Sequence, residues 1–299
     1  MRTLSYLVPE DWAGAPASAF ARRFLELSAS AWKDFKYEGG ILVNGQPCRA
    51  NAVLEAGDLL ALVLPEETAD YPSAPLPLKI LYEDGDFLLL DKPAGTPVHP
   101  SPGHDQDSLL NGLACHYQRT GQRCRVRPLY RLDRDTSGLL LFGKNRIAAG
   151  ARLEKRYLAV CQGPLAGWGT VNLPIGLEPG SKIKRACGAK LAESRPAVTH
   201  WRALAWEEGH TLLELWLETG RTHQIRVHMA ALGHPLAGDD LYGGSRERLG
   251  RQALHCQALT VQCKALGWDR AFWGEPPEDL KRAFPALLQP LERENRESL

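Results

Sequence analysis

Two carboxylates and two arginines alternate immediately ahead of a strongly apolar stretch. Residues 139–142, three leucines and a phenylalanine, predict a strand buried in the core. The preceding residues 136–138 indicate a tight turn from the charged segment into this strand. This order predicts that the charged residues form a loop at the start of a rigid, buried strand. The charge pattern alone is equally compatible with a salt-bridged surface loop.

A second basic segment follows a predicted strand at residues 212–217. Thr222 predicts the N-cap of a helix over 223–232, and Gly233 suits the position just after the helix. Arg221 would then precede a helix N-terminus, where backbone amides and a cation together favour an anion. An ordinary amphipathic helix with a basic start explains the same residues.

These segments resemble the motifs of the RluA-type pseudouridine synthases, which isomerise uridine in RNA. Residues 130–138 resemble the active-site motif of that family, with Tyr130 where histidine is usual. Residues 218–229 match a second motif of the family, and residues 155–160 resemble its short tyrosine motif. Further similarity, which extends the likeness over nearly all of residues 80–265, lies at 91–100, 236–243 and 253–255.

The resemblance implies a cofactor-free isomerase that flips the target base out of the RNA, at a cost of a few kcal/mol. It implies that Asp133 is the catalytic carboxylate, that Tyr157 is the active-site tyrosine, and that Arg221 pairs with Asp133. Arg131 resembles the side chain that fills the space left by the base. Whether the carboxylate attacks the anomeric carbon, attacks the base or assists a glycal route stays open. Without the resemblance, a tyrosine placed like Tyr157 is most often a core residue.

The net charge of +1 over 299 residues conceals two basic segments, at 119–134 and 182–195. Such segments beside a catalytic loop favour a local phosphate-binding surface, although two solvated loops are the alternative. The predicted RNA contacts, besides Arg131, are Arg123, Arg125, Arg127, Lys182, Lys184, Arg185, His223 and Arg226.

Composition limits the remaining possibilities. Hydrophobic content of 44% and charged content of 24% are typical of a soluble globular protein. The seven cysteines are odd in number and form no Cys-x-x-Cys pair, which favours free thiols in the cytoplasm and argues against zinc. No apolar stretch is long enough to span a membrane. We therefore expect a cytoplasmic monomer without metal or cofactor, whose partner is structured ribosomal or transfer RNA.

Three prolines in residues 66–78 predict a linker between a small module, residues 1–65, and a catalytic domain, residues 79–299. Asn44 and Gly45 predict a hairpin turn in the module. The module resembles a small RNA-binding module found in a ribosomal protein and at the front of many RluA-type enzymes. Its helical half lacks the usual basic residues, so a packing module is an equal alternative.

Strand-like and helix-like stretches alternate too irregularly for a regular βαβ series. They favour an α+β fold with a mixed, largely antiparallel sheet and flanking helices. The resemblance implies one long curved sheet with the active-site cleft across its middle. The predicted strands are 87–91, 138–142, 157–162, 199–204 and 212–217, and the predicted helices are 108–117, 145–154, 223–232 and 278–288.

Two other functions stay open. One is a non-catalytic RNA-binding or ribosome-assembly protein on the same fold. The other is a hydrolase that uses Asp133 and Asp135, since residues two apart on a strand point to one face. Residues 138–145 have the spacing of a phosphate-binding P-loop, but the apolar interior and the final Asn145 exclude it.

Overall fold

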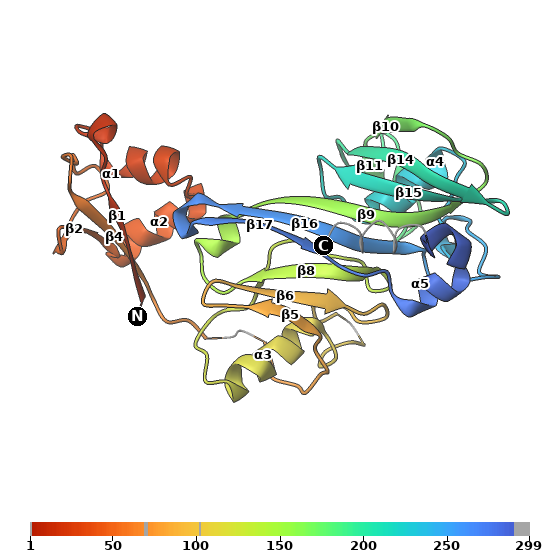
Figure 1. Ribbon diagram of the computed structural model, residues 1–299, viewed down its shortest axis with the longest axis horizontal. Coiled ribbons are helices and arrows are strands. Elements are labelled where there is room, and N and C mark those ends of the chain that lie inside the picture. The colour runs from red at the N-terminus through yellow and green to blue at the C-terminus, as the bar shows by residue number, and fades with distance from the viewer. Residues whose placement is uncertain (1, 69–70, 102, 290–299) are drawn as a thin grey trace.

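The structure is a computed structural model and describes residues 2–68, 71–101 and 103–289. Within these residues the strands form three sheets, of four, ten and three strands (Figure 1). The expected α+β fold with a mixed, largely antiparallel sheet is confirmed. No helix of the described part is both long and apolar enough to cross a membrane.

The ten-stranded sheet is the frame of the molecule. Its strands run in the order β10-β14-β15-β9-β16-β8-β6-β5, with β17 paired to β16 and β7 paired to β8. The strands are β5 (Ile80–Glu83), β6 (Phe87–Lys92), β7 (Arg127–Pro128), β8 (Ser137–Gly143), β9 (Arg152–Gln162), β10 (Trp168–Asn172), β14 (Val198–Glu207), β15 (His210–Leu217), β16 (Leu254–Cys263) and β17 (Trp268–Trp273).

Strand β8 is buried along its whole length and pairs in parallel with β16. The two backbones meet at Gly138, whose φ is +115°. A Cβ atom there would lie 2.3 Å from the carbonyl oxygen of Cys256, so that only glycine fits. This contact places the start of β8, and the charged loop before it, at the middle of the sheet.

Helices lie on both sides of this sheet. Helix α3 (Leu109–Arg119) lies beside β5 and β6 and begins with a capping box formed by Ser108 and Asn111 (Figure 1). Helix α5 (Glu278–Ala283) contributes Leu280 to an apolar cluster with Leu158 and Val160 of β9. Helix α4 (Gln224–Ala231) follows β15, and Gly233 after it adopts a φ of +84°, as predicted.

The predicted helix at 145–154 is wrong. A short 3₁₀ helix, Ala148–Gly150, is followed directly by β9, which begins at Arg152. The side chain of Asn145 accepts from the backbone nitrogens of Ile147 and Ala148 and forms a tight turn instead. Residues 152–154, the last three of the predicted helix, pair with β16, so sheet pairing overrides their helical propensity.

The N-terminal module is a four-stranded antiparallel sheet with two helical segments. The expected hairpin is confirmed at Asn44 and Gly45, both of which have positive φ. Its elements are β1 (Arg2–Leu7), α1 (Ala17–Ala19), a π-helical turn Phe20–Phe24, α2 (Ala29–Glu38), β2 (Ile41–Val43), β3 (Gln46–Pro47) and β4 (Leu59–Leu64).

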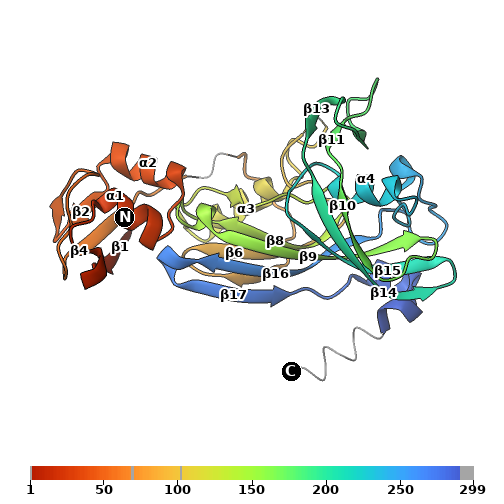
Figure 2. The same cartoon turned by 90° about the horizontal axis from the view of Figure 1, so that it is seen from above.

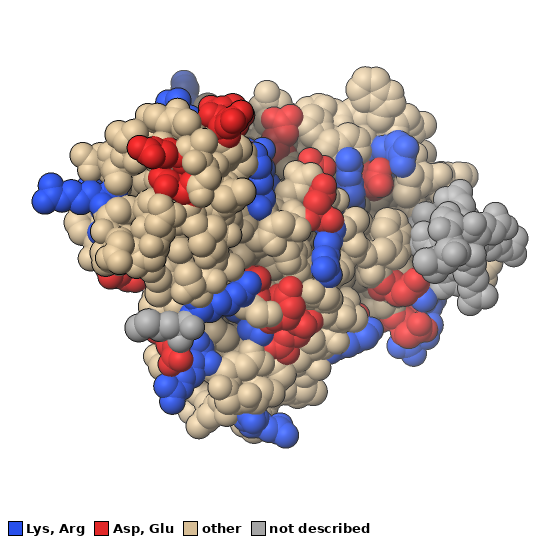
Figure 3. All heavy atoms as spheres, turned by 60° about the vertical axis from the view of Figure 1, so that its left-hand side comes forward, with Lys and Arg blue, Asp and Glu red and all other residues tan. Residues whose placement is uncertain are grey.

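Ion pairs join the helical half of the module to Arg146 and Arg152, just before and at the start of β9. Arg146 lies between Glu38 of α2, at 2.8 Å, and Glu67 after β4, at 3.5 Å. Arg152 pairs with Glu26 at 3.1 Å. Acidic and basic side chains are interleaved on the face where the module comes forward, with no large patch of one sign (Figure 3). The side of the module where basic residues are missing is therefore a docking face.

A small three-stranded sheet projects above α4, away from the long sheet (Figure 2). It consists of β11 (Ile175–Leu177), β12 (Arg185–Cys187) and β13 (Ala192–Arg195). The remaining short elements are the 3₁₀ helices Glu10–Trp12, Asp240–Tyr242 and Lys264–Leu266.

Candidate active site

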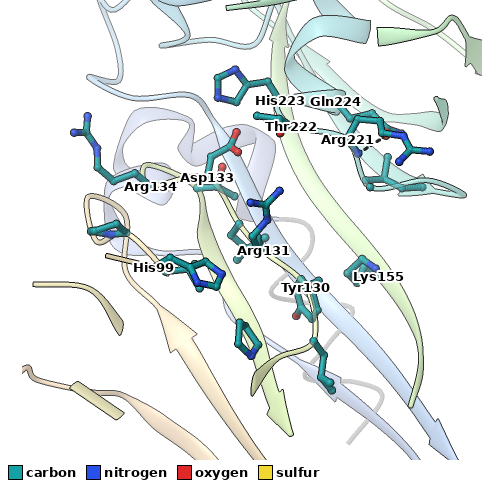
Figure 4. Close-up of a pocket in the computed structure, with 18 of the residues that line it drawn as sticks. His99, Tyr130, Arg131, Asp133, Arg134, Lys155, Arg221, Thr222, His223 and Gln224 are labelled. Atoms are coloured by element: carbon teal, nitrogen blue, oxygen red, sulfur yellow. Dashed lines mark hydrogen bonds between the residues drawn. The ribbon is translucent and has the colours of Figure 1, made fainter. Parts of the chain in front are cut away.

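A cavity of about 920 Å³ opens between the loop ahead of β8, the first half of β9 and the start of α4 (Figure 4). Asp133 is the one carboxylate among the described residues that line it. Seven arginine and lysine side chains line the same cavity, namely Arg125, Arg127, Arg131, Arg134, Lys155, Arg221 and Arg226. The site is therefore built to receive a polyanion around a single carboxylate.

The loop that carries Asp133 is held by its backbone. The carbonyl of Asp133 accepts from Thr136 N at 3.1 Å. Lys92, at the end of β6, is fully buried and donates from Nζ to the carbonyls of Arg134 and Thr136, at 2.7 and 2.8 Å. Arg251 donates to the carbonyl of Asp135 at 3.2 Å. Each carbonyl from 133 to 136 thus has a donor, which fixes the direction of the Asp133 side chain.

Arg226, in the first turn of α4, is the cation that contacts Asp133. Its Nη1 lies 3.2 Å from a carboxylate oxygen of Asp133. The other edge of the guanidinium, Nε and Nη2, donates to both oxygens of Asp239 at 2.7 Å each. Only 7% of Arg226 is exposed, and the two carboxylates raise its pKa against the effect of burial.

The predicted ion pair between Arg221 and Asp133 is wrong. The Nε of Arg221 donates to the Pro196 carbonyl at 3.0 Å, and the side chain points away from Asp133 (Figure 4). The reason is the start of α4: the helix begins at Gln224, and the Gln224 side chain accepts from the backbone nitrogen of Arg221. Thr222 is not the N-cap, because His223 occupies that position. Arg221 still lines the cavity, at its edge.

Tyr157, on β9, is 5% exposed and lines the cavity. Burial, followed by the neighbouring Cys256 and Asp133, raises its pKa well above the usual range. The phenol is therefore a neutral hydroxyl close to the carboxylate. Tyr130, where the family usually has histidine, donates to the Leu139 carbonyl at 2.7 Å and so supports the loop.

His223 takes a left-handed backbone conformation, with φ of +58°, at the turn into α4. Its Nδ1 lies 2.9 Å from the hydroxyl of Tyr242. Burial lowers its pKa, and the nearby Asp133 acts in the opposite direction. Non-glycine residues in this conformation concentrate at functional sites, because the surrounding structure must hold them there.

The predicted RNA contacts divide into two groups. Arg125, Arg127 and Arg131 line the cavity, as do His223 and Arg226. The members that lie outside the cavity are Arg123, Lys182, Lys184 and Arg185. Arg123 pairs with Glu66 at 3.0 Å, and the Lys184 and Arg185 side chains pair with Glu178 and Glu193.

The carboxylate pair that a hydrolase would need is absent from the described cavity lining. Asp133 and Asp135 lie in a turn before β8, which begins at Ser137, so the strand geometry expected for them is wrong. Asp135 pairs with Arg134 at 3.2 Å and does not line the cavity. No cluster of three metal-ligating side chains occurs in the part of the chain that the structure describes.

Sequence reasoning missed the structural roles of Lys92, Asp239 and Arg251. Lys92 carried a signal, since a lysine that ends an apolar strand has to find partners when it is buried. Asp239 belongs to a segment similar to the family, yet nothing in its spacing points to Arg226. The two residues meet only because the chain returns to α4 after Pro235.

Comparison with known proteins decides the family. The family model described as RNA pseudouridylate synthase matches residues 86–231. Uncharacterized RNA pseudouridine synthase YjbO of Bacillus subtilis is 41% identical over 270 residues, which cover 86% of this chain and 94% of that protein. The chain belongs to the RluA-type RNA pseudouridine synthases. It is an isomerase that acts on RNA.

Two further comparisons extend this result. Ribosomal large subunit pseudouridine synthase D of Escherichia coli is 34% identical over 287 residues, 88% of this chain and 87% of that protein. The solved structure of Human RNA Pseudouridylate Synthase Domain Containing 1 superimposes with a TM-score of 0.58 at 26% identity, covering 76% of this chain and 96% of that chain. The pseudouridine synthase fold therefore spans most of the molecule.

Proposed function

We propose that this pseudouridine synthase isomerises specific uridines in structured ribosomal or transfer RNA, with Asp133 as the reacting carboxylate. The observation that carries the proposal is the isolation of Asp133 among cations in a cavity large enough for a nucleotide. A stacked uridine has to leave its helix or loop to reach such a cavity. The name of the Escherichia coli relative makes large-subunit ribosomal RNA the first substrate to test.

The proposed roles follow the positions of the side chains. Asp133 reacts as an anion on the sugar or the base. Tyr157 packs against the flipped base, with its hydroxyl available for proton movement at the ribose. Arg131 is exposed at the mouth of the cavity and fills the space in the RNA that the base has left. Arg226, in place of Arg221, holds the Asp133 carboxylate in position.

Phosphates are held by the outer cations. Arg125 and Arg127, in the segment ahead of β8, and Arg221, ahead of α4, all line the cavity, so an RNA strand that enters it meets cations from both segments. Lys182 and Lys184, in the loop before β12 of the small sheet, and Arg185, the first residue of β12, contact the RNA farther from the reacting base. These contacts position the RNA and do not select the uridine.

Mapping of pseudouridines tests the proposal directly. Ribosomal and transfer RNA from cells with and without the gene are compared, and we expect discrete uridines to lose modification in the deletion strain. Wild-type protein should restore them and Asp133→Asn should not. Restoration by Asp133→Asn would instead support the non-catalytic assembly function.

A further inference from the structure

Asp239 is a buried carboxylate beside the site. Its side chain is 1% exposed and accepts two hydrogen bonds of 2.7 Å from Arg226. Asp133 accepts one bond of 3.2 Å from the same guanidinium and is 26% exposed to the cavity. Arg226 therefore forms two hydrogen bonds with Asp239 and one longer hydrogen bond with Asp133. Asp133, which has fewer hydrogen bonds to the guanidinium, is the carboxylate that faces the cavity.

The geometry of the guanidinium makes this arrangement directional. A bidentate grip on Nε and Nη2 fixes both the position and the plane of the group. The two hydrogens on Nη1 then have fixed directions in that plane, and Asp133 lies within hydrogen-bond distance of this nitrogen. The Tyr242 ring, 5.1 Å from the guanidinium carbon, covers one face of the group. The Tyr242 hydroxyl is itself held by the backbone nitrogen of Arg185 at 3.0 Å.

The segment that carries Asp239 is held in place by close contacts between main chains. A Cβ atom at Gly238 would lie 1.8 Å from the carbonyl oxygen of Arg251, and one at Gly244 would lie 1.9 Å from that of Leu236. The Asp239 carbonyl accepts from the backbone nitrogen of Gly244 at 2.8 Å. Close backbone packing on both sides leaves Asp239 no room to follow a displaced Arg226.

We propose that Asp239 is a positioning residue of the isomerase, which aims Nη1 of Arg226 at Asp133. The proposal rests on the function proposed above for Asp133. It adds that the reacting carboxylate is directed by a second carboxylate, which does not line the cavity and touches no substrate. The excess negative charge of the trio stays on Asp133, since Asp239 is already neutralised by two short bonds.

The competing explanation is purely structural: Asp239 could serve only to stabilise the fold of the tightly packed segment that carries it, without acting on Asp133 through Arg226. A double-mutant cycle separates the two. If Asp239 acts through Arg226 on Asp133, its replacement matters only while Arg226 is present. If it supports the fold in general, its replacement costs the same in either background.

The experiment uses the full chain and an RNA transcript labelled with tritium at carbon 5 of uridine. Single-turnover rates and RNA affinity are measured for Asp239→Asn, Arg226→Gln and the double variant, with Asp133→Asn alongside. Asp240→Asn is the matched control, because Asp240 is the exposed neighbour and pairs only with Arg246 among the described residues. We expect Asp239→Asn to lose at least about tenfold in rate with affinity changed less than about threefold.

In the Arg226→Gln background, Asp239→Asn should change the rate by less than about twofold, as should Asp240→Asn in the wild type. Equal losses in both backgrounds, or a wild-type rate for Asp239→Asn, would overturn the proposal. If melting curves show that Asp239→Asn is unfolded, Arg226→Lys decides, because it keeps the charge and removes the fork. A wild-type rate for Arg226→Lys would then overturn the proposal that Asp239 aims Arg226 at Asp133. Activity of Asp133→Asn would overturn the proposed function itself.

Discussion

Arg226 approaches Asp133 with a single nitrogen, Nη1, at 3.2 Å. The contact joins the first turn of α4 to the loop before β8, 93 residues earlier in the chain. Both partners lie at the boundary of the cavity, and the carboxylate keeps an open side toward it. The side chain of Asp133 is 26% exposed, whereas Arg226 is buried, so replacement of Asp133 should disturb the fold less than replacement of Arg226.

Asp133→Asn is expected to abolish tritium release from labelled RNA and to leave the melting temperature nearly unchanged. The amide keeps the shape of the side chain and removes the anion that reacts. Activity is measured under single turnover, and unfolding by circular dichroism. Residual turnover within about tenfold of wild type, a barrier change of only about 1.4 kcal/mol, contradicts a catalytic role.

Arg226→Ala and Arg221→Ala are expected to differ in kind. Arg226→Ala should lose several powers of ten in rate with a smaller loss of RNA affinity, because it leaves Asp133 without its directing cation. Arg221→Ala should mainly weaken RNA binding, since its side chain lies at the cavity edge on the Pro196 carbonyl. Rate and affinity are measured separately for each variant. A large loss of rate for Arg221→Ala together with a mere loss of affinity for Arg226→Ala would instead show that Arg221 is the partner of Asp133 during the reaction.

Arg125→Gln is expected to weaken the binding of all RNAs alike and to lower the salt dependence. Each lost phosphate contact reduces the log–log slope by about 0.7 to 0.9. Arg123→Gln is the matched control, because Arg123 is 74% exposed and pairs with Glu66 outside the cavity. A salt titration of binding measures both. An unchanged slope for Arg125→Gln would mean that Arg125 does not contact phosphate and that this segment is a solvated loop.

His255 is expected to make the protein sensitive to acid. Burial lowers its pKa from 6.5 to about 4, so between these values the unfolded state binds more protons than the folded state. The free energy of unfolding should therefore fall as the pH drops through this window, with a contribution of about 3 kcal/mol. Urea unfolding at pH 7, 5.5 and 4.5 measures the effect. His255→Gln should show a shallower fall, and an equal fall would show that carboxylates alone cause it.

The sequence predicted the elements whose signal is local. The apolar run of β8 and the glycine after α4 both appear where expected, because one residue type or one periodicity determines them. The predicted helix at 145–154 does not form, because its last three residues pair with a strand more than a hundred residues later. No local pattern contains that partner.

The same distinction explains the site. Asp133 and Tyr157 could be located from short motifs, and the structure places both on the cavity. The partner of Asp133 could not, since Arg221 and Arg226 sit in the same motif and only the first residue of α4 decides which one turns inward. The contact between Asp239 and Arg226 depends on how the chain turns back toward α4, and the spacing of residues in the sequence does not predict that turn.

At Gly138 the backbones of β8 and β16 approach so closely that a Cβ atom on residue 138 would lie 2.3 Å from the carbonyl oxygen of Cys256. The start of β8 is therefore fixed by the contact of two main chains, whereas the leucines that follow fill the core. Related chains can exchange those apolar residues without moving the carboxylate, so long as volume is kept. Position 138 has no such tolerance. Among related chains, the apolar residues of β8 should therefore vary more than the position of the carboxylate does.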